Sequence, residues 1–210
     1  MLLQLLFFFV LFFAKIQILG LLFLTIETGL LMRKSARLLK LSRIFFWAYV
    51  FLLLGKIVFL YSLQFYTWSL YPHSRYFLPP HQPLSYFFSY SWQHFGKEPI
   101  FALGVGLFFF CLLWLLTKIS RGRFFYEEEK YLGGLAVIAN IWPQNFLVVF
   151  LALGLGIGVW LIRILRQYLA GQSAELPFLN LRFFWPMAGI LLIIFGQLLV
   201  KATFLESIGL

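Results

Sequence analysis

The stretch IFALGVGLFFFCLLWLLT, Ile100–Thr117, is followed directly by KISRGR, residues 118–123. The first part is free of charge over close to the ~20 residues that a helix needs to cross a hydrocarbon core. The second part contributes Lys118, Arg121 and Arg123, and clusters of Lys and Arg mark the cytoplasmic ends of membrane helices. This stretch therefore predicts a transmembrane helix that ends on the cytoplasmic side of a membrane.

Similar apolar runs recur along the chain. Residues 1–26 form one that carries Lys15, and we interpret it as a retained first span, because it lacks the basic start and the small-residue cleavage site of a secretory signal. A shorter run, Tyr131–Trp142, carries Asn140 and is marginal in length for a span. Three further runs approach full length, with Lys56 as their one charged residue: Ile44–Phe65, Phe146–Ile162 and Phe183–Val200.

Composition agrees with a membrane protein. The 210 residues are 62% hydrophobic and 11% charged, which is more apolar surface than a soluble domain of this size can bury. The net charge of +10 would suit a nucleic-acid partner, but the basic residues lie at span ends and no recognition motif accompanies them. The sequence predicts an all-α fold, a polytopic membrane helix bundle of about six transmembrane helices forming a single domain, 1–210. The expected environment is the lipid bilayer, with no nucleic acid.

The basic residues also predict an orientation. Most of the 17 Lys and Arg residues lie in three alternate connections, 33–43, 118–130 and 163–182. The positive-inside rule places these connections in the cytoplasm. A multi-pass protein of the cell membrane is then expected, with both termini and residues 66–99 outside the cytoplasm. This alternation requires Tyr131–Trp142 to cross the membrane.

Residues 66–99 are rich in Tyr, Trp, Pro and His. Four prolines argue against a continuous helix, so we predict an aromatic and Pro-rich interfacial loop here. The three histidines, His73, His81 and His94, match no metal-site spacing. The single Cys111 excludes an internal disulfide and a cysteine metal cluster. No metal and no cofactor are expected.

Two apolar runs carry closely spaced glycines. Gly154, Gly156 and Gly158 have the spacing of a nucleotide-binding loop, but no strand precedes them, so that fingerprint has no context. Small residues at such spacing let membrane helices approach one another. Close helix packing is the interpretation for these glycines and for Gly104 and Gly106.

The acidic residues are the candidates for chemistry. The chain has no Asp; Glu27 ends the first span and Glu127–Glu129 precede the run at 131–142, both on the expected cytoplasmic side. Carboxyl groups near a membrane are costly and often functional. If the bundle brings two of them together, they can share one proton while the ionised partner activates water, as in aspartic-type proteases.

A purely structural role is the alternative. Glu27 can pair with Arg33 or Lys34 of the following basic stretch. The three consecutive glutamates can form a solvated loop whose charge is balanced by Arg121, Arg123 and Lys130. Neither pairing involves catalysis.

The order of these segments resembles the type IV prepilin peptidases, whose second catalytic Asp lies in a Gly-x-Gly-Asp-x-Lys motif that opens a later span. Here YEEEKYLGGL, residues 126–135, occupies that place, after an apolar span and the short basic SRGR, residues 120–123. TIET, residues 25–28, followed by basic residues, resembles the segment that bears the first Asp. LPF, residues 176–178, is similar to the Pro-Phe segment before the last span. Residues 66–99 resemble an insertion.

The resemblance implies a membrane-embedded aspartic-type endopeptidase that cleaves prepilin-type leader peptides at the cytoplasmic membrane face. Alignment on Lys130 puts Glu128 in place of the second Asp and Glu27 in place of the first, with Glu127, Glu129 and Lys130 itself as alternates. Both catalytic Asp residues are then Glu, whose carboxyl lies about 1 Å further out, a displacement that can cost ~100-fold in rate.

Two other functions remain open on the sequence. The motif glycines of the family would fall at Phe125 and Glu127, which favours a catalytically inactive descendant that acts as a scaffold or assembly subunit of a pilus or secretion system. The partners of such a subunit would be prepilin-like proteins or other assembly proteins. A small transporter component is the third candidate, suggested by Lys15 and Lys56 inside apolar runs.

Overall fold

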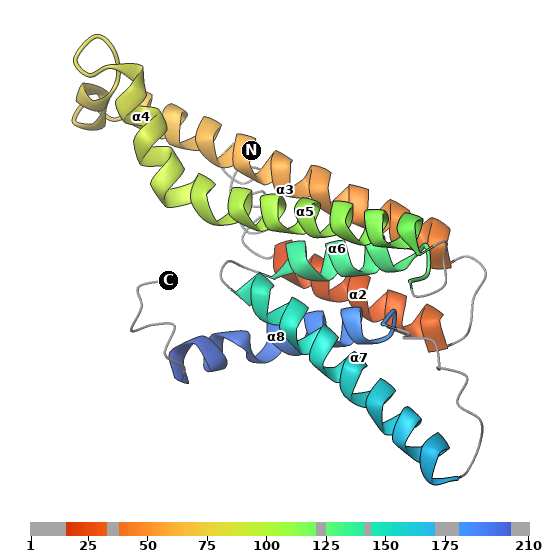
Figure 1. The fold of residues 1–210 in the computed structure, drawn as a ribbon. Coiled ribbons are helices and arrows are strands. Elements are labelled where there is room, and N and C mark those ends of the chain that lie inside the picture. Colours follow the sequence, from red (N-terminus) through yellow and green to blue (C-terminus); the bar gives the residue numbers. More distant parts are fainter. Residues whose placement is uncertain (1–15, 33–37, 121–124, 141–143, 171–180, 203–210) are drawn as a thin grey trace.

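The computed structural model describes residues 16–32, 38–120, 125–140, 144–170 and 181–202 (Figure 1). In this part of the chain all regular elements are helical and no strand is present. The longer helices are α2 (Ile16–Met32), α3 (Leu38–Leu70), α5 (Lys97–Ile119), α6 (Glu129–Ala139), α7 (Gln144–Leu169) and α8 (Phe184–Ala202). Three short helices connect α3 to α5: η1 (Ser74–Phe77), α4 (Leu84–Ser91) and η2 (Trp92–Gly96).

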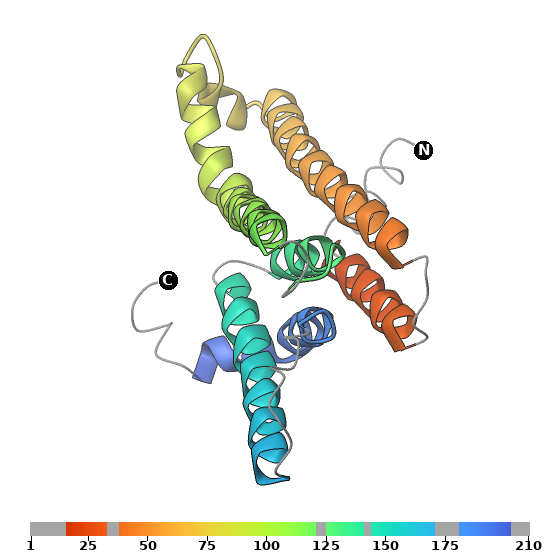
Figure 2. The ribbon, with the colours of Figure 1, turned by 45° about the vertical axis from the view of Figure 1, so that its right-hand side comes forward.

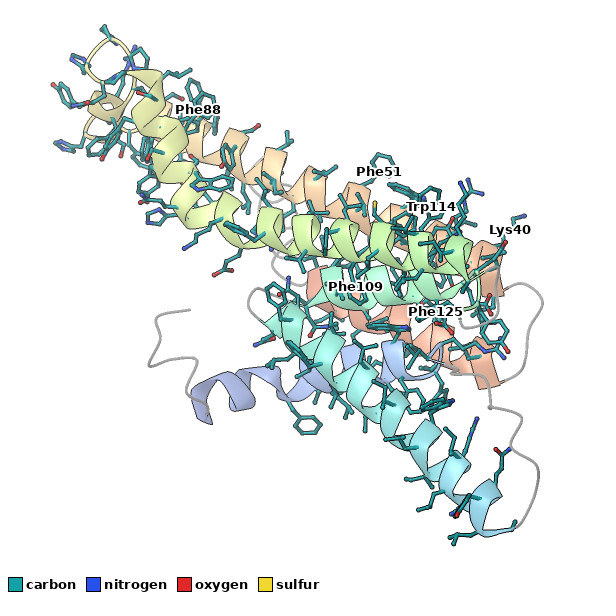
Figure 3. All side chains as sticks on the ribbon, viewed as in Figure 1. Lys40, Phe51, Phe88, Phe109, Trp114 and Phe125 are labelled. Atoms are coloured by element: carbon teal, nitrogen blue, oxygen red, sulfur yellow. The ribbon has the colours of Figure 1, made fainter. Side chains whose placement is uncertain are left out.

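Several helices have the length and apolarity of membrane spans. Among the described residues, three helical runs are long and apolar enough to cross a bilayer: Leu38–Leu70, Leu84–Ile119 and Gln144–Leu169. Large apolar side chains lie on their outer surfaces, such as Phe51, which is 68% exposed, and Trp114 (Figure 3). Such extensive exposed apolar surface is unusual for a water-soluble protein and suits contact with lipid. The predicted all-helical class and its membrane-compatible character are thus confirmed.

Two shorter apolar helices accompany these runs. The described part of the predicted first span is α2, and its residues 1–15, which include Lys15, lie outside the described residues. The predicted last span at 183–200 corresponds to α8. Both α2 and α8 pack against α6 and against each other.

The short helix α6 is the centre of the bundle. It contacts α2, α3, α5, α7 and α8, and it lies between these helices in Figure 2. Its residues from Leu132 to Ala139 are all buried. The helix is about 16 Å long, so α6 alone is shorter than a hydrocarbon core of about 30 Å. The run predicted as a marginal span at 131–142 is therefore a buried core helix, and its last two residues lie outside the described part.

Small residues allow α6 to occupy this central position. Gly134 faces Phe46 of α3, and a Cβ atom added at Gly134 would lie 2.7 Å from that ring. Gly133 faces Leu113 of α5 at the same 2.7 Å. Any side chain at these two positions would push α3 or α5 away. The two consecutive glycines therefore set how closely α3 and α5 approach α6.

The packing interpretation of the spaced glycines holds for two of them. Gly106 lies against Ile138 of α6, and Gly156 lies against Leu181, which precedes α8. Gly104, Gly154 and Gly158 have no atom within 4 Å of a Cβ built on them, so they face open space. Spacing alone does not reveal which glycine of a group meets a neighbouring helix.

The predicted loop at residues 66–99 is largely helical. The helix break covers only residues 71–83, where four of the prolines lie, and the rest of the segment prolongs α3 and α5 beyond the other helices (Figure 1). An aromatic cluster explains this difference: Trp68, Leu78 and Phe87 are buried together, with Tyr61 and Tyr90 packed against them. The rings of Trp68 and Phe87 pack edge to face, 5.7 Å apart. These contacts between distant residues stabilise helices that the local sequence does not predict.

Candidate functional site

Glu27 lies in the second half of α2 and is completely buried, with 0% of its surface exposed. Its neighbour across the helix interface is Ser42 of α3, which is equally buried. Neither carboxyl oxygen of Glu27 makes a hydrogen bond of good geometry, and the Ser42 hydroxyl is likewise unpartnered. A buried carboxyl group without a donor costs several kcal/mol when it is ionised, so its presence requires an explanation.

Glu129, the first residue of α6, is the second fully buried acid, also with 0% exposed. Its backbone N–H donates to the carbonyl oxygen of Tyr126 at 3.1 Å, which fixes the start of the helix. Its carboxyl group lies near the backbone of Leu181 and Arg182, just before α8, but neither of its oxygens makes a hydrogen bond of good geometry. Glu129 therefore shares with Glu27 complete burial and the lack of a well-formed hydrogen bond to its carboxyl group.

Glu128 has a different environment. The Arg182 side chain donates a hydrogen bond from Nη1 to Glu128 Oε1 at 3.0 Å, and the two groups form an ion pair. The same guanidinium lies over the Tyr126 ring, 4.4 Å from its centroid. This contact ties the segment before α8 to the start of α6. Among Glu27, Glu128 and Glu129, Glu128 is thus the acid with an ion-pair partner. The ion pair restricts the rotation of its carboxyl group.

The remaining predicted residues lie at the periphery of this region. Glu127 is exposed to solvent. Lys130 is partly buried, and its ammonium group lies 5.3 Å from the centroid of the Tyr131 ring. The basic neighbours proposed for the structural alternative, Arg33, Lys34, Arg121 and Arg123, lie outside the described residues. Neither Glu127 nor Lys130 joins the buried acids.

Helix packing places Glu27 and Glu129 at the same end of the bundle. Gly20 of α2 packs against Ala139 of α6, and these two helices run in opposite directions (Figure 1). From that contact, Glu27 lies about 10 Å along α2 and Glu129 about 15 Å along α6. The two carboxyl groups are therefore at similar depth on adjacent helices, although Glu27 faces Ser42 and Glu129 faces the segment before α8.

Two contributors to this region were not predicted as site residues. Arg182 was interpreted only as a topology signal, and Ser42 carried no signal in the sequence. Both can be found only from the packed structure, because each lies far along the chain from the acid that it approaches. Within the described residues, no group of three or more His, Cys or Glu is arranged to hold a metal ion.

Comparisons of the chain with models of known protein families, with curated proteins and with solved structures found no match.

Proposed function

We propose that the chain is an integral protein of the cell membrane in which six helices alternate in direction across the bilayer. The short helix α6 is the one that crosses inside the bundle, surrounded by the others. The basic connections lie in the cytoplasm. The three long apolar helices support this arrangement. So does the alternating direction of successive helices about α6. In this orientation Glu27 and Glu129 lie at the cytoplasmic end, and the α3–α5 extension lies on the opposite side.

The function that the geometry supports best is that of a peptidase of the prepilin-leader type. The single observation that carries this proposal is the complete burial of Glu27 and Glu129, at similar depth, without a well-formed hydrogen bond to either carboxyl group. The resemblance in segment order to that family adds to it. Carboxyl groups buried in this way reduce the free energy of unfolding, and proteins keep such groups chiefly at functional sites.

In the proposed mechanism, Glu27 and Glu129 share one proton, because two carboxyl groups in one poorly solvated site do not both ionise cheaply. The ionised group removes a proton from water, and the resulting nucleophile attacks the scissile carbonyl of a leader peptide. The protonated group donates its proton to the carbonyl oxygen. Cleavage then returns a proton to the departing amine and restores the starting pair.

The second acid of this pair is Glu129 rather than Glu128, which alignment on Lys130 suggested. Glu128 is engaged with Arg182, so its proposed role is to hold the start of α6 against the segment before α8. Opening of that ion pair would let substrate backbone approach Glu129. The consecutive glutamates thus have separate roles, one in chemistry and one in positioning.

The experiment is leader processing in cells that co-express a candidate prepilin with the wild-type protein or with single variants. Glu27→Gln and Glu129→Gln are expected to stop processing, because the amide cannot exchange a proton. Glu127→Gln is the matched control, since Glu127 is exposed and adjacent, and it is expected to process normally. Equal processing by all three variants would contradict the assignment.

A non-catalytic scaffold or assembly subunit of a pilus or secretion system is the second candidate. It is favoured by the ion pair between Glu128 and Arg182, which gives a structural role to the acid that aligns with the second catalytic Asp of the prepilin peptidases. It is also favoured by the presence of Glu at both positions where that family has a catalytic Asp. Cross-linking in cells separates the two functions. A scaffold is expected to capture other assembly proteins and to support assembly equally well as Glu27→Gln and Glu129→Gln.

A further inference from the structure

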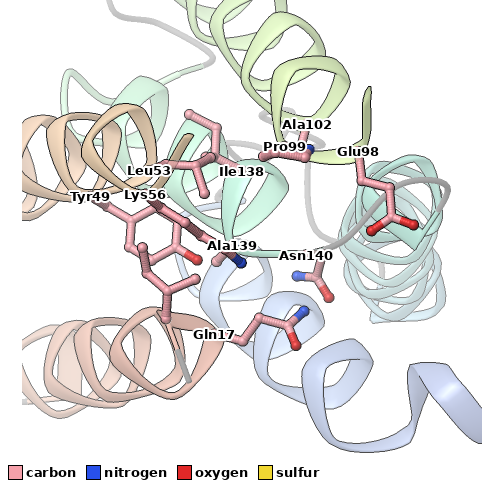
Figure 4. Close-up of a pocket in the computed structure, with 11 residues that line it drawn as sticks. Gln17, Tyr49, Leu53, Lys56, Glu98, Pro99, Ala102, Ile138, Ala139 and Asn140 are labelled. Atoms are coloured by element: carbon pink, nitrogen blue, oxygen red, sulfur yellow. The ribbon is translucent and has the colours of Figure 1, made fainter. Parts of the chain in front are cut away.

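A partly open cavity of about 110 Å³ lies at the opposite end of the bundle from the buried acids, and Figure 4 shows the residues that line it. It is formed between α2, α3, α5 and α6. Its charged and polar lining residues are Gln17, Tyr49, Lys56, Glu98 and Asn140. The cavity is independent of the proposed peptidase site, which it does not touch.

The cavity has a charge of each sign. Lys56 reaches it from α3 and Glu98 from α5, and the two groups are near enough to interact electrostatically. Figure 4 shows them on either side of Asn140. Among the described residues, no ion pair within 4 Å joins Lys56 to Glu98. Each charge therefore remains available to a group that enters the cavity.

Asn140 forms a fixed part of the cavity wall. Only 1% of this residue is exposed, and its Nδ2 donates to the carbonyl oxygens of Ala136 at 2.8 Å and Gly189 at 3.4 Å. These bonds orient the amide, and its Oδ1 is covered by protein atoms. The groups that can meet a ligand in the cavity are therefore the two charged side chains, Lys56 and Glu98.

The cavity also has a defined depth in the proposed membrane orientation. From Leu38, where α3 begins, to Lys56 is about 27 Å at the rise of an α-helix. A hydrocarbon core is about 30 Å thick. Glu98 immediately precedes the apolar part of α5. The cavity is therefore level with the border between lipid tails and head groups on the outer side.

We propose that this cavity binds a zwitterionic group that has a primary ammonium and an anionic oxygen, the chemistry of phosphoethanolamine. The anionic oxygens face Lys56, and the ammonium donates to Glu98. A simple anion would leave Glu98 unsatisfied and a simple cation would leave Lys56 unsatisfied. The cavity is partly open, so a head group can project from it, and a volume of about 110 Å³ is too small for a whole lipid.

The chemistry excludes a close relative of this ligand. A trimethylammonium group has the same charge but no N–H, so it cannot donate to Glu98. The loss of a hydrogen bond to a charged group reduces affinity by roughly tenfold. Phosphatidylethanolamine should therefore bind better than phosphatidylcholine with identical acyl chains. Free phosphoethanolamine has the same ammonium and phosphate groups as the head group of phosphatidylethanolamine, so it is the soluble molecule that this cavity would also bind.

The test is native mass spectrometry of the full-length protein purified in detergent, with each of the two lipids added in turn. The wild-type protein is expected to retain phosphatidylethanolamine roughly tenfold better than phosphatidylcholine. Lys56→Met and Glu98→Gln are expected to remove that preference. Lys97→Gln is the matched control, since Lys97 is exposed beside Glu98 but does not line the cavity, and it is expected to keep the preference.

Several results would overturn the proposal. They are equal retention of the two lipids by the wild-type protein, a preference that survives in both cavity variants, or its loss in Lys97→Gln. Glu98 is exposed, so Glu98→Gln should keep the wild-type melting temperature and remain informative even if Lys56→Met does not fold. Displacement of the bound lipid by free phosphoethanolamine would identify a soluble ligand. Its failure to displace the lipid would identify the membrane as the source.

Discussion

The two ends of α6 bury polar side chains in opposite ways. At the end that we place in the cytoplasm, Glu129 of α6 and Glu27 of the adjacent helix α2 are fully buried without a well-formed hydrogen bond to either carboxyl group. At the other end, Asn140 is held by hydrogen bonds from its amide nitrogen and lines a cavity. The first arrangement leaves both carboxyl groups without compensation for their burial, whereas the second satisfies the amide nitrogen of Asn140 and fixes its orientation. This difference is the basis for proposing a chemical role at one end of the core helix and a binding role at the other.

The largest expected effect separates activity from stability at the acidic end. Glu27→Gln and Glu129→Gln should each lower the rate of leader processing by about 10²–10⁴-fold, the usual contribution of a general acid or base. The melting temperature of each variant should be unchanged or higher, because a neutral amide is less costly to bury than a carboxylate. Thermal unfolding of the purified proteins provides the second measurement. A fall in both activity and melting temperature would indicate a structural role instead.

Much of the helical arrangement could be predicted from the sequence, because apolar length and basic ends are local features. The runs at Ile44–Phe65, Ile100–Thr117 and Phe146–Ile162 lie within α3, α5 and α7. The role of α6 could not be predicted in the same way, since a helix buried on every side has no polar face to reveal its orientation.

The candidate site was predictable only to within the group of three glutamates. Residues 127–129 have the same chemistry, and successive positions at a helix start differ by about 100° in direction. The choice between them depends on Arg182, which is distant in the sequence and forms an ion pair with Glu128. The cavity depends on Glu98 of α5 lying near Lys56 of α3, and no local sequence pattern indicates that proximity.

A second prediction tests the close packing of the α6 end that bears Asn140. Gly106→Leu should destabilise the protein by about 1–3 kcal/mol or more, since its side chain would overlap Ile138 of α6. Gly104→Leu is the matched control two positions earlier in α5, where a side chain meets open space. The measurement is the melting temperature of each variant in the same detergent. Equal melting temperatures would contradict the described packing of α5 on α6.

A third prediction concerns Asn140 itself. Asn140→Ala removes the hydrogen bonds to the carbonyl oxygens of Ala136 and Gly189, which should reduce the free energy of unfolding by about 1–2 kcal/mol. Gln93→Ala removes an exposed amide and should have little effect. Denaturant unfolding in micelles compares the two variants. A loss no greater than that of Gln93→Ala would mean that Asn140 does not stabilise its end of α6.

The smallest expected effect is at the ion pair beside the acidic end. Arg182→Gln should cost about 1 kcal/mol, because the pair is partly solvent-exposed and its stacking on Tyr126 adds modestly. Arg166→Gln, at an exposed position in the last turn of α7, should be neutral. Melting temperatures measured at low and high salt should show the Arg182→Gln effect shrinking as salt rises. An effect that is insensitive to salt would contradict an ion-pair origin.

The proximity of Glu27 and Glu129 can be measured directly by intramolecular cross-linking. Glu27→Cys and Glu129→Cys are combined in a Cys111→Ser protein and treated with a short bifunctional thiol reagent in membranes. The account predicts an efficient cross-link within one chain for this pair, and a much weaker one when Glu127→Cys replaces Glu129→Cys. Absence of a cross-link between positions 27 and 129, in a protein whose two thiols each react singly, would contradict a shared site.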